Sequence, residues 1–199
     1  MQRRRFLAGL ATAGSVVAAG CGAVSGDRTL SEPTVTSDSP GRRALVFTRD
    51  GDEIGHVDVD GQIDSGVIDL STEIWHREGT LVNAIELRLW TPGTDATPAE
   101  VAVVSPIEGD SSPPPEVTLS TPDRKPGTVV AITDLDDLAD ETISTIDLNV
   151  DPPDAAGALA VHATVELTGA GLLGANYTLD GELELAYPEL DGQGESAER

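Results

Sequence analysis

Apolar and polar residues alternate with a period of two through much of this chain, and this pattern limits the possible folds more than any other feature. In residues 159–167, Leu, Val and Ala alternate with Ala, His, Thr and Glu, and residues 177–187 repeat the pattern with Tyr and Leu. Successive side chains of a strand point to opposite faces of the sheet, so both runs predict half-buried strands. The Gly-rich residues 169–176 between them are short enough for antiparallel neighbours. We expect one shared buried face, formed by Val161, Val165, Leu179 and Leu183.

The same alternation predicts further strands along the rest of the chain. They cover residues 44–48, 54–59, 66–75, 81–90, 99–105, 117–120, 128–132 and 146–150. Asp50-Gly51 is typical of a tight hairpin turn and lies between the first two of these strands. Helix is predicted only at residues 135–141, where Thr133 or Asp134 would cap one helical turn. About nine strands with one helical turn predict an all-β, antiparallel, immunoglobulin-like β-sandwich.

The core of this sandwich must form without a disulfide and with few aromatic residues, because the chain has one cysteine, two Trp, two Tyr and two Phe. Trp75 and Trp90 each stand at the end of an alternating run. We expect them to close the two ends of the core, and an exposed platform for a ligand is the alternative.

The N-terminus carries a different pattern. Arg3, Arg4 and Arg5 precede an apolar stretch of small residues at positions 6–19, and Ala-Ala-Gly stands directly before Cys21. An apolar stretch of about 14 residues fits the core of a signal peptide and is shorter than the roughly 20 residues that cross a bilayer. We therefore predict that residues 1–20 are a cleaved signal peptide, and a cytosolic protein with an accidental apolar N-terminus is the alternative.

These N-terminal residues resemble two known export motifs. Arg3-Arg4-Arg5-Phe6-Leu7 resembles the R-R-x-F-L of a twin-arginine (Tat) signal, with Arg3, Arg4, Phe6 and Leu7 at the defining positions, and Ala-Ala-Gly-Cys resembles a lipobox. The resemblance implies a lipoprotein that is exported, acquires its lipid on Cys21, and stays anchored to the extracellular face of the cell membrane.

Acidic residues outnumber basic ones almost three to one. The chain has 35 Asp and Glu against 12 Lys and Arg, and removing residues 1–20 with their three arginines leaves 9 minus 35, a net charge of −26. This acidity, with a single lysine, resembles the proteins of salt-accumulating haloarchaea, where charge keeps proteins soluble in molar salt. The arginines form no basic patch, so we expect no nucleic-acid partner. A specific cation or basic-protein site is the alternative explanation of the acidity.

Composition divides the chain into four parts. After the signal peptide of residues 1–20, residues 21–43 are rich in Ser, Thr, Pro, Gly and Asp and are predicted to form a flexible tether. Residues 44–188 suit one β-sandwich domain, and the polar residues 189–199 suit a disordered tail.

Catalytic patterns are scarce in this sequence. His56, His76 and His162 fall in three different predicted strands, and no H-E-x-x-H, G-x-S-x-G or P-loop pattern occurs. The only cysteine, Cys21, serves as the anchor, and alternation places His162 on the wet face of its strand. We therefore predict no catalytic residue, no enzyme activity and no cofactor.

Two acidic clusters are candidate metal sites. Asp58, Asp60 and Asp64 superficially resemble a calcium loop, but their spacing fails the EF-hand pattern, and Asp60-Gly61 is better explained as a turn. The acids between residues 134 and 141 would sit at the predicted helical turn, whose dipole stabilises them without a metal. No metal ligand set is predicted, and calcium binding at either cluster stays open.

One N-x-S/T sequon occurs, Asn176-Tyr177-Thr178, at the edge of the Gly-rich loop. On an exported protein this position makes Asn176 a candidate for N-glycosylation, and a chance tripeptide is the alternative.

Two classes of function remain. The first is a non-enzymatic interaction or structural module, which presents a β-sandwich to another envelope protein or to a surface polymer. The second is a solute- or cation-binding envelope lipoprotein. An exposed apolar or aromatic patch would favour the first, and a deep pocket with converging polar groups would favour the second.

Overall fold

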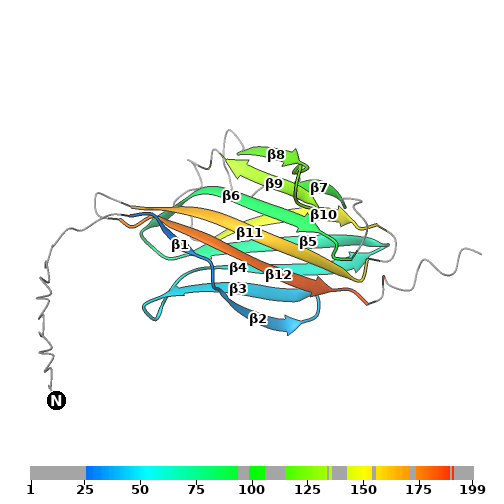
Figure 1. Ribbon diagram of the computed structural model, residues 1–199, viewed down its shortest axis with the longest axis horizontal. Coiled ribbons are helices and arrows are strands. Elements are labelled where there is room, and N and C mark those ends of the chain that lie inside the picture. The colour runs from blue at the N-terminus through cyan, green and yellow to red at the C-terminus, as the bar shows by residue number, and fades with distance from the viewer. Residues whose placement is uncertain are drawn as a thin grey trace, which may run out of the picture.

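The protein is an all-β sandwich of two six-stranded sheets (Figure 1). The computed structural model describes residues 26–93, 99–105, 115–133, 135, 143–153, 156–170, 174–188 and 190. Twelve strands and no helix occur in this part of the chain. The predicted antiparallel sandwich is thus confirmed, with more strands than the expected nine.

Sheet I contains the C-terminal strands. In spatial order it consists of β1 (Arg28–Leu30), β12 (Tyr177–Ala186), β11 (Ala158–Gly169), β6 (Thr80–Trp90), β9 (Thr128–Thr133) and β8 (Glu116–Ser120). All neighbours pair antiparallel except β1, which runs parallel to β12. The expected antiparallel pairing of β11 with β12 is confirmed, with Val165 opposite Leu179.

Sheet II contains most of the N-terminal strands. Its spatial order is β2 (Thr34–Ser39), β3 (Arg42–Arg49), β4 (Asp52–Asp64), β5 (Val67–His76), β10 (Ile143–Asp151) and β7 (Glu100–Ser105). All of these pairs are antiparallel. Figure 1 shows β4 and β5 crossing behind β11 and β12, so the core lies between the two layers.

The core forms where the alternating apolar side chains of the two sheets face each other. Val161, Val165 and Leu179 are fully buried and Leu183 nearly so, which confirms the predicted shared face. Sheet II contributes Ile68, Leu70 and Ile74 from β5, with Leu45 and Phe47 from β3. Side chains one position away along each strand face outward.

Two-residue turns connect the long strands of sheet II. Asp50 and Gly51 both have positive φ, 53° and 91°, as a tight hairpin between right-twisted strands requires. This confirms the predicted hairpin of β3 and β4. Ser65 and Gly66 form the equivalent turn between β4 and β5, with φ of 54° and 91°.

The predicted turn at Asp60-Gly61 is wrong, because both residues lie inside β4. Glycine is needed there for packing and not for turning: a Cβ on Gly61 would overlap the Tyr187 hydroxyl oxygen. The Gly61 amide donates a hydrogen bond to the Gly41 carbonyl at 2.8 Å, which holds the β2–β3 turn against β4.

The prediction that residues 21–43 form a tether is wrong from Arg28 onward. β1, β2 and the start of β3 lie there, and only residues before Arg28 precede the first strand. β2 is exposed along its whole length, so main-chain pairing with β3 holds it in place and apolar burial does not. At the other end, Leu190 is buried, so the ordered domain also extends slightly beyond residue 188.

The tryptophans do not close the ends of the core, which corrects a third prediction. Trp75 and Trp90 are half-buried and stand outside the core cluster. Trp75 alternates with the buried Ile74 and therefore faces away from sheet I, stacked on His56. Trp90 lies beneath the Arg88 guanidinium, 3.8 Å from the ring centroid. The predicted helical turn falls outside the described residues, apart from the buried Leu135.

Candidate functional site: a polar groove on sheet II

The outer face of sheet II is hollowed into a groove of about 680 Å³. Strands β3, β4, β5, β10 and β7 contribute its lining, which is mostly polar: Arg42, Asp58, Asp60, Gln62, Asp69, Leu70, Ser71, Glu73, Val104, Asp147, Leu148 and Asn149. Its volume lies within the range of pockets that bind small organic ligands. We call this surface the sheet II groove.

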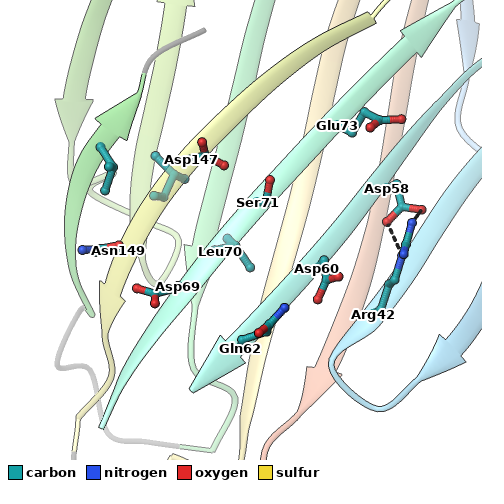
Figure 2. Close-up of a pocket in the computed structure, with 12 residues that line it drawn as sticks. Arg42, Asp58, Asp60, Gln62, Asp69, Leu70, Ser71, Glu73, Asp147 and Asn149 are labelled. Carbon is teal, nitrogen blue, oxygen red and sulfur yellow. Dashed lines mark hydrogen bonds and ion pairs between the residues drawn. The ribbon is translucent and has the colours of Figure 1, made fainter. Parts of the chain in front are cut away.

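Strand register arranges the groove side chains in rows across the sheet. One row places Asp60 of β4, Ser71 of β5 and Asp147 of β10 side by side. The next row contains Gln62, Asp69 and Asn149 from the same three strands. Figure 2 shows both rows along neighbouring strands. Because paired strands lie about 4.8 Å apart, the polar groups form a regular lattice on a rigid floor.

Arg42 and Asp58 form the one ion pair in the groove among the described residues. The Arg42 Nε and Nη2 atoms each donate a hydrogen bond of 3.1 Å to a different carboxylate oxygen of Asp58, drawn dashed in Figure 2. The hydrogen bond and the charge of Asp58 raise the pKa of Arg42 above its ordinary value. This two-point geometry fixes the orientation of both side chains, although the exposed pair adds little stability.

The remaining groove carboxylates have no ion-pair partner in the described part of the chain. These are Asp60, Asp69, Glu73 and Asp147. On the outer face of sheet I, by contrast, two acids lie beside basic side chains. Asp180 lies 3.4 Å from the His162 ring, and Glu182 lies 3.9 Å from Arg88. The groove therefore has hydrogen-bonding capacity that the protein itself leaves unused.

An aromatic pair stands on the same face, beyond one end of the groove. His56 of β4 pairs in register with Trp75 of β5, one step from the Asp58–Glu73 pair. Their ring centroids are 5.4 Å apart with an interplanar angle of 15°, and His56 Nδ1 lies 2.6 Å from Glu53. Trp75 also lines a smaller hollow of about 420 Å³.

The three histidines lie in three different environments. His76 is fully buried and its Nδ1 lies 2.9 Å from the Thr80 hydroxyl, so it belongs to the interior. His162 faces outward from sheet I, as alternation predicts. His56 is the one histidine near the groove.

Asn176, the candidate glycosylation residue, lies at the start of β12. Its Nδ2 donates a hydrogen bond of 2.9 Å to Asp27, and its Oδ1 accepts one of 3.2 Å from the Gly169 amide. The side chain thus joins β1, β11 and β12, which gives this asparagine a structural role whether or not a glycan is attached.

Several predicted site residues lie outside the described part of the chain. These are Cys21, the Tat residues Arg3, Arg4, Phe6 and Leu7, and the acids at 134, 136, 137, 140 and 141. Among the residues that are described, no group of three His, Cys, Asp or Glu side chains is arranged to hold a metal ion. In the same part of the chain no helix is long and apolar enough to cross a membrane.

The groove is not recognisable from the sequence pattern. Asp58 and Asp60 stand out in the sequence as part of an acidic cluster. Ser71 and Asp147 come from other strands and join them only through sheet register. The alternation along β5 does indicate part of the groove, because it places the side chains of Asp69, Ser71, Glu73 and Trp75 on the face opposite Leu70.

Comparison with solved structures gives only weak similarities. The yeast delta-COP-I mu-homology domain, solved with a Dsl1 WxWxV peptide, is 10% identical over 65% of this chain, with a TM-score of 0.37. This chain spans about half of that protein, 54%. The human F-spondin reeler domain is 11% identical, with 65% of this chain and 84% of that chain covered and a TM-score of 0.37. The GAE domain of Saccharomyces cerevisiae GGA2p is 10% identical over 79% of this chain and 97% of that chain, with a TM-score of 0.30.

No curated protein sequence matches this chain. One family model does, over residues 27–189, which include every strand described above. The chain therefore belongs to the DUF8121 family, a domain of unknown function.

Proposed function

We propose that this protein is a lipid-anchored lipoprotein on the extracellular face of a haloarchaeal cell, where it binds an envelope partner through the sheet II groove and catalyses no reaction. The observation that carries the proposal is the groove itself. It is built from rigid strands and lined by polar groups, of which Asp60, Asp69, Glu73 and Asp147 are not paired with a basic side chain of the described chain.

Three features support the interaction role. The groove side chains stand on paired strands, so little conformational entropy is lost when a partner binds. Arg42 and Asp58 are already fixed by their own ion pair. The lining spreads over five strands and converges on no single atom position, as suits recognition of an extended surface.

The location part of the proposal comes from the N-terminal motifs. A Cys21→Ser variant lacks the thiol that would carry the lipid, and the mature domain, with a net charge of −26, is repelled by anionic headgroups. We expect this variant to appear in the medium or as an uncleaved precursor. Replacing Arg3 and Arg4 with lysine should instead leave the precursor in the cytoplasm. Full retention of the Cys21→Ser variant in membranes would contradict the anchor.

The interaction part is tested by cross-linking in intact cells. A photoreactive residue at Ser71, in the centre of the groove, should give defined high-mass adducts. The matched control places the same residue at Thr164, which faces outward from sheet I. We expect strong adducts from position 71 and weak ones from position 164. Equal adducts from both positions, or none from position 71, would contradict a binding role for the groove.

A further inference from the structure

We infer that the partner of the sheet II groove is a neutral carbohydrate polymer, bound through its hydroxyl groups. The inference rests on the proposed function, since it names the chemistry of what the groove binds. It follows from the donors and acceptors of the lining, from their spacing, and from the aromatic pair beside the groove.

Donors and acceptors alternate within the groove. In one row the amides of Gln62 and Asn149, each both donor and acceptor, flank the Asp69 carboxylate, which accepts only. In the next row the Ser71 hydroxyl lies between the carboxylates of Asp60 and Asp147. A ligand that satisfies both rows must donate and accept at closely spaced positions, which sugar hydroxyls do. An ammonium group only donates, so it would leave the amide N–H groups unpaired.

The spacing of the carboxylates also disfavours a single cation. Asp60 and Asp147 stand on strands separated by β5, so their backbones are about 10 Å apart. The described residues contain no group of three ligands that converges on one metal position. A lattice of this spacing instead suits a ligand with a row of separate polar groups.

Trp75 extends the same face with an apolar surface. It is half-buried, held against His56 by parallel stacking, and two residues along β5 from Glu73. The C–H groups of a sugar ring pack on an aromatic surface while its hydroxyls form hydrogen bonds, so one strand presents both kinds of contact. A polymer lying along β5 would reach the tryptophan and the polar rows together.

Salt gives a further reason to prefer a neutral ligand. In molar salt the screening length falls to about 3 Å, which weakens attraction between exposed charges. Hydrogen bonds between carboxylates and hydroxyls do not depend on a charged ligand. The groove would therefore keep its function under the conditions that the acidic composition predicts.

Calorimetric titration of the full mature chain tests the inference. The protein is held in a detergent without a sugar headgroup and titrated with linear hexasaccharides of α- and β-linked glucose, mannose and N-acetylglucosamine. We expect at least one to bind, with an affinity that changes little between low and high salt. Asp69→Ala should weaken that binding about tenfold or more, because it removes the carboxylate that accepts hydrogen bonds from the ligand hydroxyls. Asn149→Ala, in the same row, should act in the same direction.

The control is Glu86→Ala, an exposed acid on the outer face of sheet I, which should leave the affinity within about twofold. Circular dichroism checks that every variant stays folded. The inference would be overturned if no hexasaccharide bound at concentrations up to about 10 mM, since a dissociation constant above that value is weak even for a small ligand. If an arginine-rich peptide bound in a salt-sensitive way and no hexasaccharide did, the partner would be a basic protein. The proposed binding role of the groove, which cross-linking tests, would then still stand. Hexasaccharide binding that Asp69→Ala leaves unchanged would also refute the groove as the site.

Discussion

Replacing Gly61 with alanine should destabilise the sandwich through one identifiable contact. Gly61 lies in β4, where an added Cβ would overlap the Tyr187 hydroxyl oxygen. The same carbon would come within 3.2 Å of Ile68 and Leu70. Tyr187 is only 3% exposed, so its ring cannot move away into solvent without opening the core.

The magnitude follows from two opposing terms. Inserting a carbon into a packed core costs about 1–3 kcal/mol, and alanine recovers about 0.5–1 kcal/mol because it has less backbone freedom than glycine in the unfolded chain. We expect a net loss of about 1–2 kcal/mol, which lowers the melting temperature by about 2–8 °C in a domain of this size. Urea unfolding at fixed high salt measures the loss directly.

A double-mutant cycle with Tyr187→Phe identifies the contact. The phenylalanine lacks the overlapping oxygen, so Gly61→Ala should cost about 1 kcal/mol less in that background. The control is Gly66→Ala, at a turn with φ of 91° and open space around it. Its cost comes from backbone strain and should be the same in both backgrounds. Equal costs of Gly61→Ala with tyrosine and with phenylalanine at position 187 would refute the packing explanation.

Three further predictions address the core and the charge. Val165→Asp places a charge on a fully buried position of β11 and should cost several kcal/mol, out of the about 5–15 kcal/mol typical of a domain. Glu166→Ala, on the wet face of the same strand, should change stability by at most about 0.5 kcal/mol. Equal effects of the two changes, measured by urea unfolding, would contradict the half-buried strand. Thr72→Val should stabilise the protein by about 1 kcal/mol, because the buried Thr72 hydroxyl has no hydrogen-bond partner among the described residues. A loss of stability would indicate that this hydroxyl is satisfied. The melting temperature should fall when NaCl is lowered from about 3 M to about 0.1 M, because screening of the −26 net charge then weakens. An unchanged melting temperature would exclude a halophilic adaptation.

Most of the strands that could be predicted bury one face, although the exposed β8 was also predicted. β11 and β12 alternate cleanly because their inward side chains meet the opposite sheet and their outward ones meet water. β2 gave no such signal, since none of its six residues is buried and its Ser and Thr side chains resemble a linker. Its stability comes from main-chain pairing with β3, which composition does not report.

The tryptophans show how residue size misled the prediction. Trp75 shares the parity of Asp69 and Glu73, so alternation alone placed it on the wet face. Its large apolar surface suggested the core instead. The surface is partly covered after all, but by the His56 ring across the strand and not by sheet I. Local parity was the better guide, because sheet geometry fixes the direction of a side chain before packing acts on it.

The groove could not be predicted, because it exists only once the strand order of sheet II is known. Asp60 and Ser71 meet through the β4–β5 hairpin, which a sequence can suggest. Asp147 joins them because β10 pairs with β5, although four strands lie between the two in the chain and three of these, β6, β8 and β9, belong to the other sheet. Long-range pairing of this kind leaves no local trace in the sequence.

The corrected start of the domain bears on how the groove is presented. With the lipid on Cys21, as proposed, only six peptide units separate it from Asp27, which span at most about 21 Å. Asp27 is held by a hydrogen bond from Asn176. It lies at the end of the sandwich where β12 begins, and Figure 1 shows the β3–β4 hairpin at the same end. That end must face the membrane closely. β4 runs from this end outward, so His56 lies nearer the membrane and Gln62 farther from it. The row of Gln62, Asp69 and Asn149 is therefore the part of the groove that an envelope polymer would meet first.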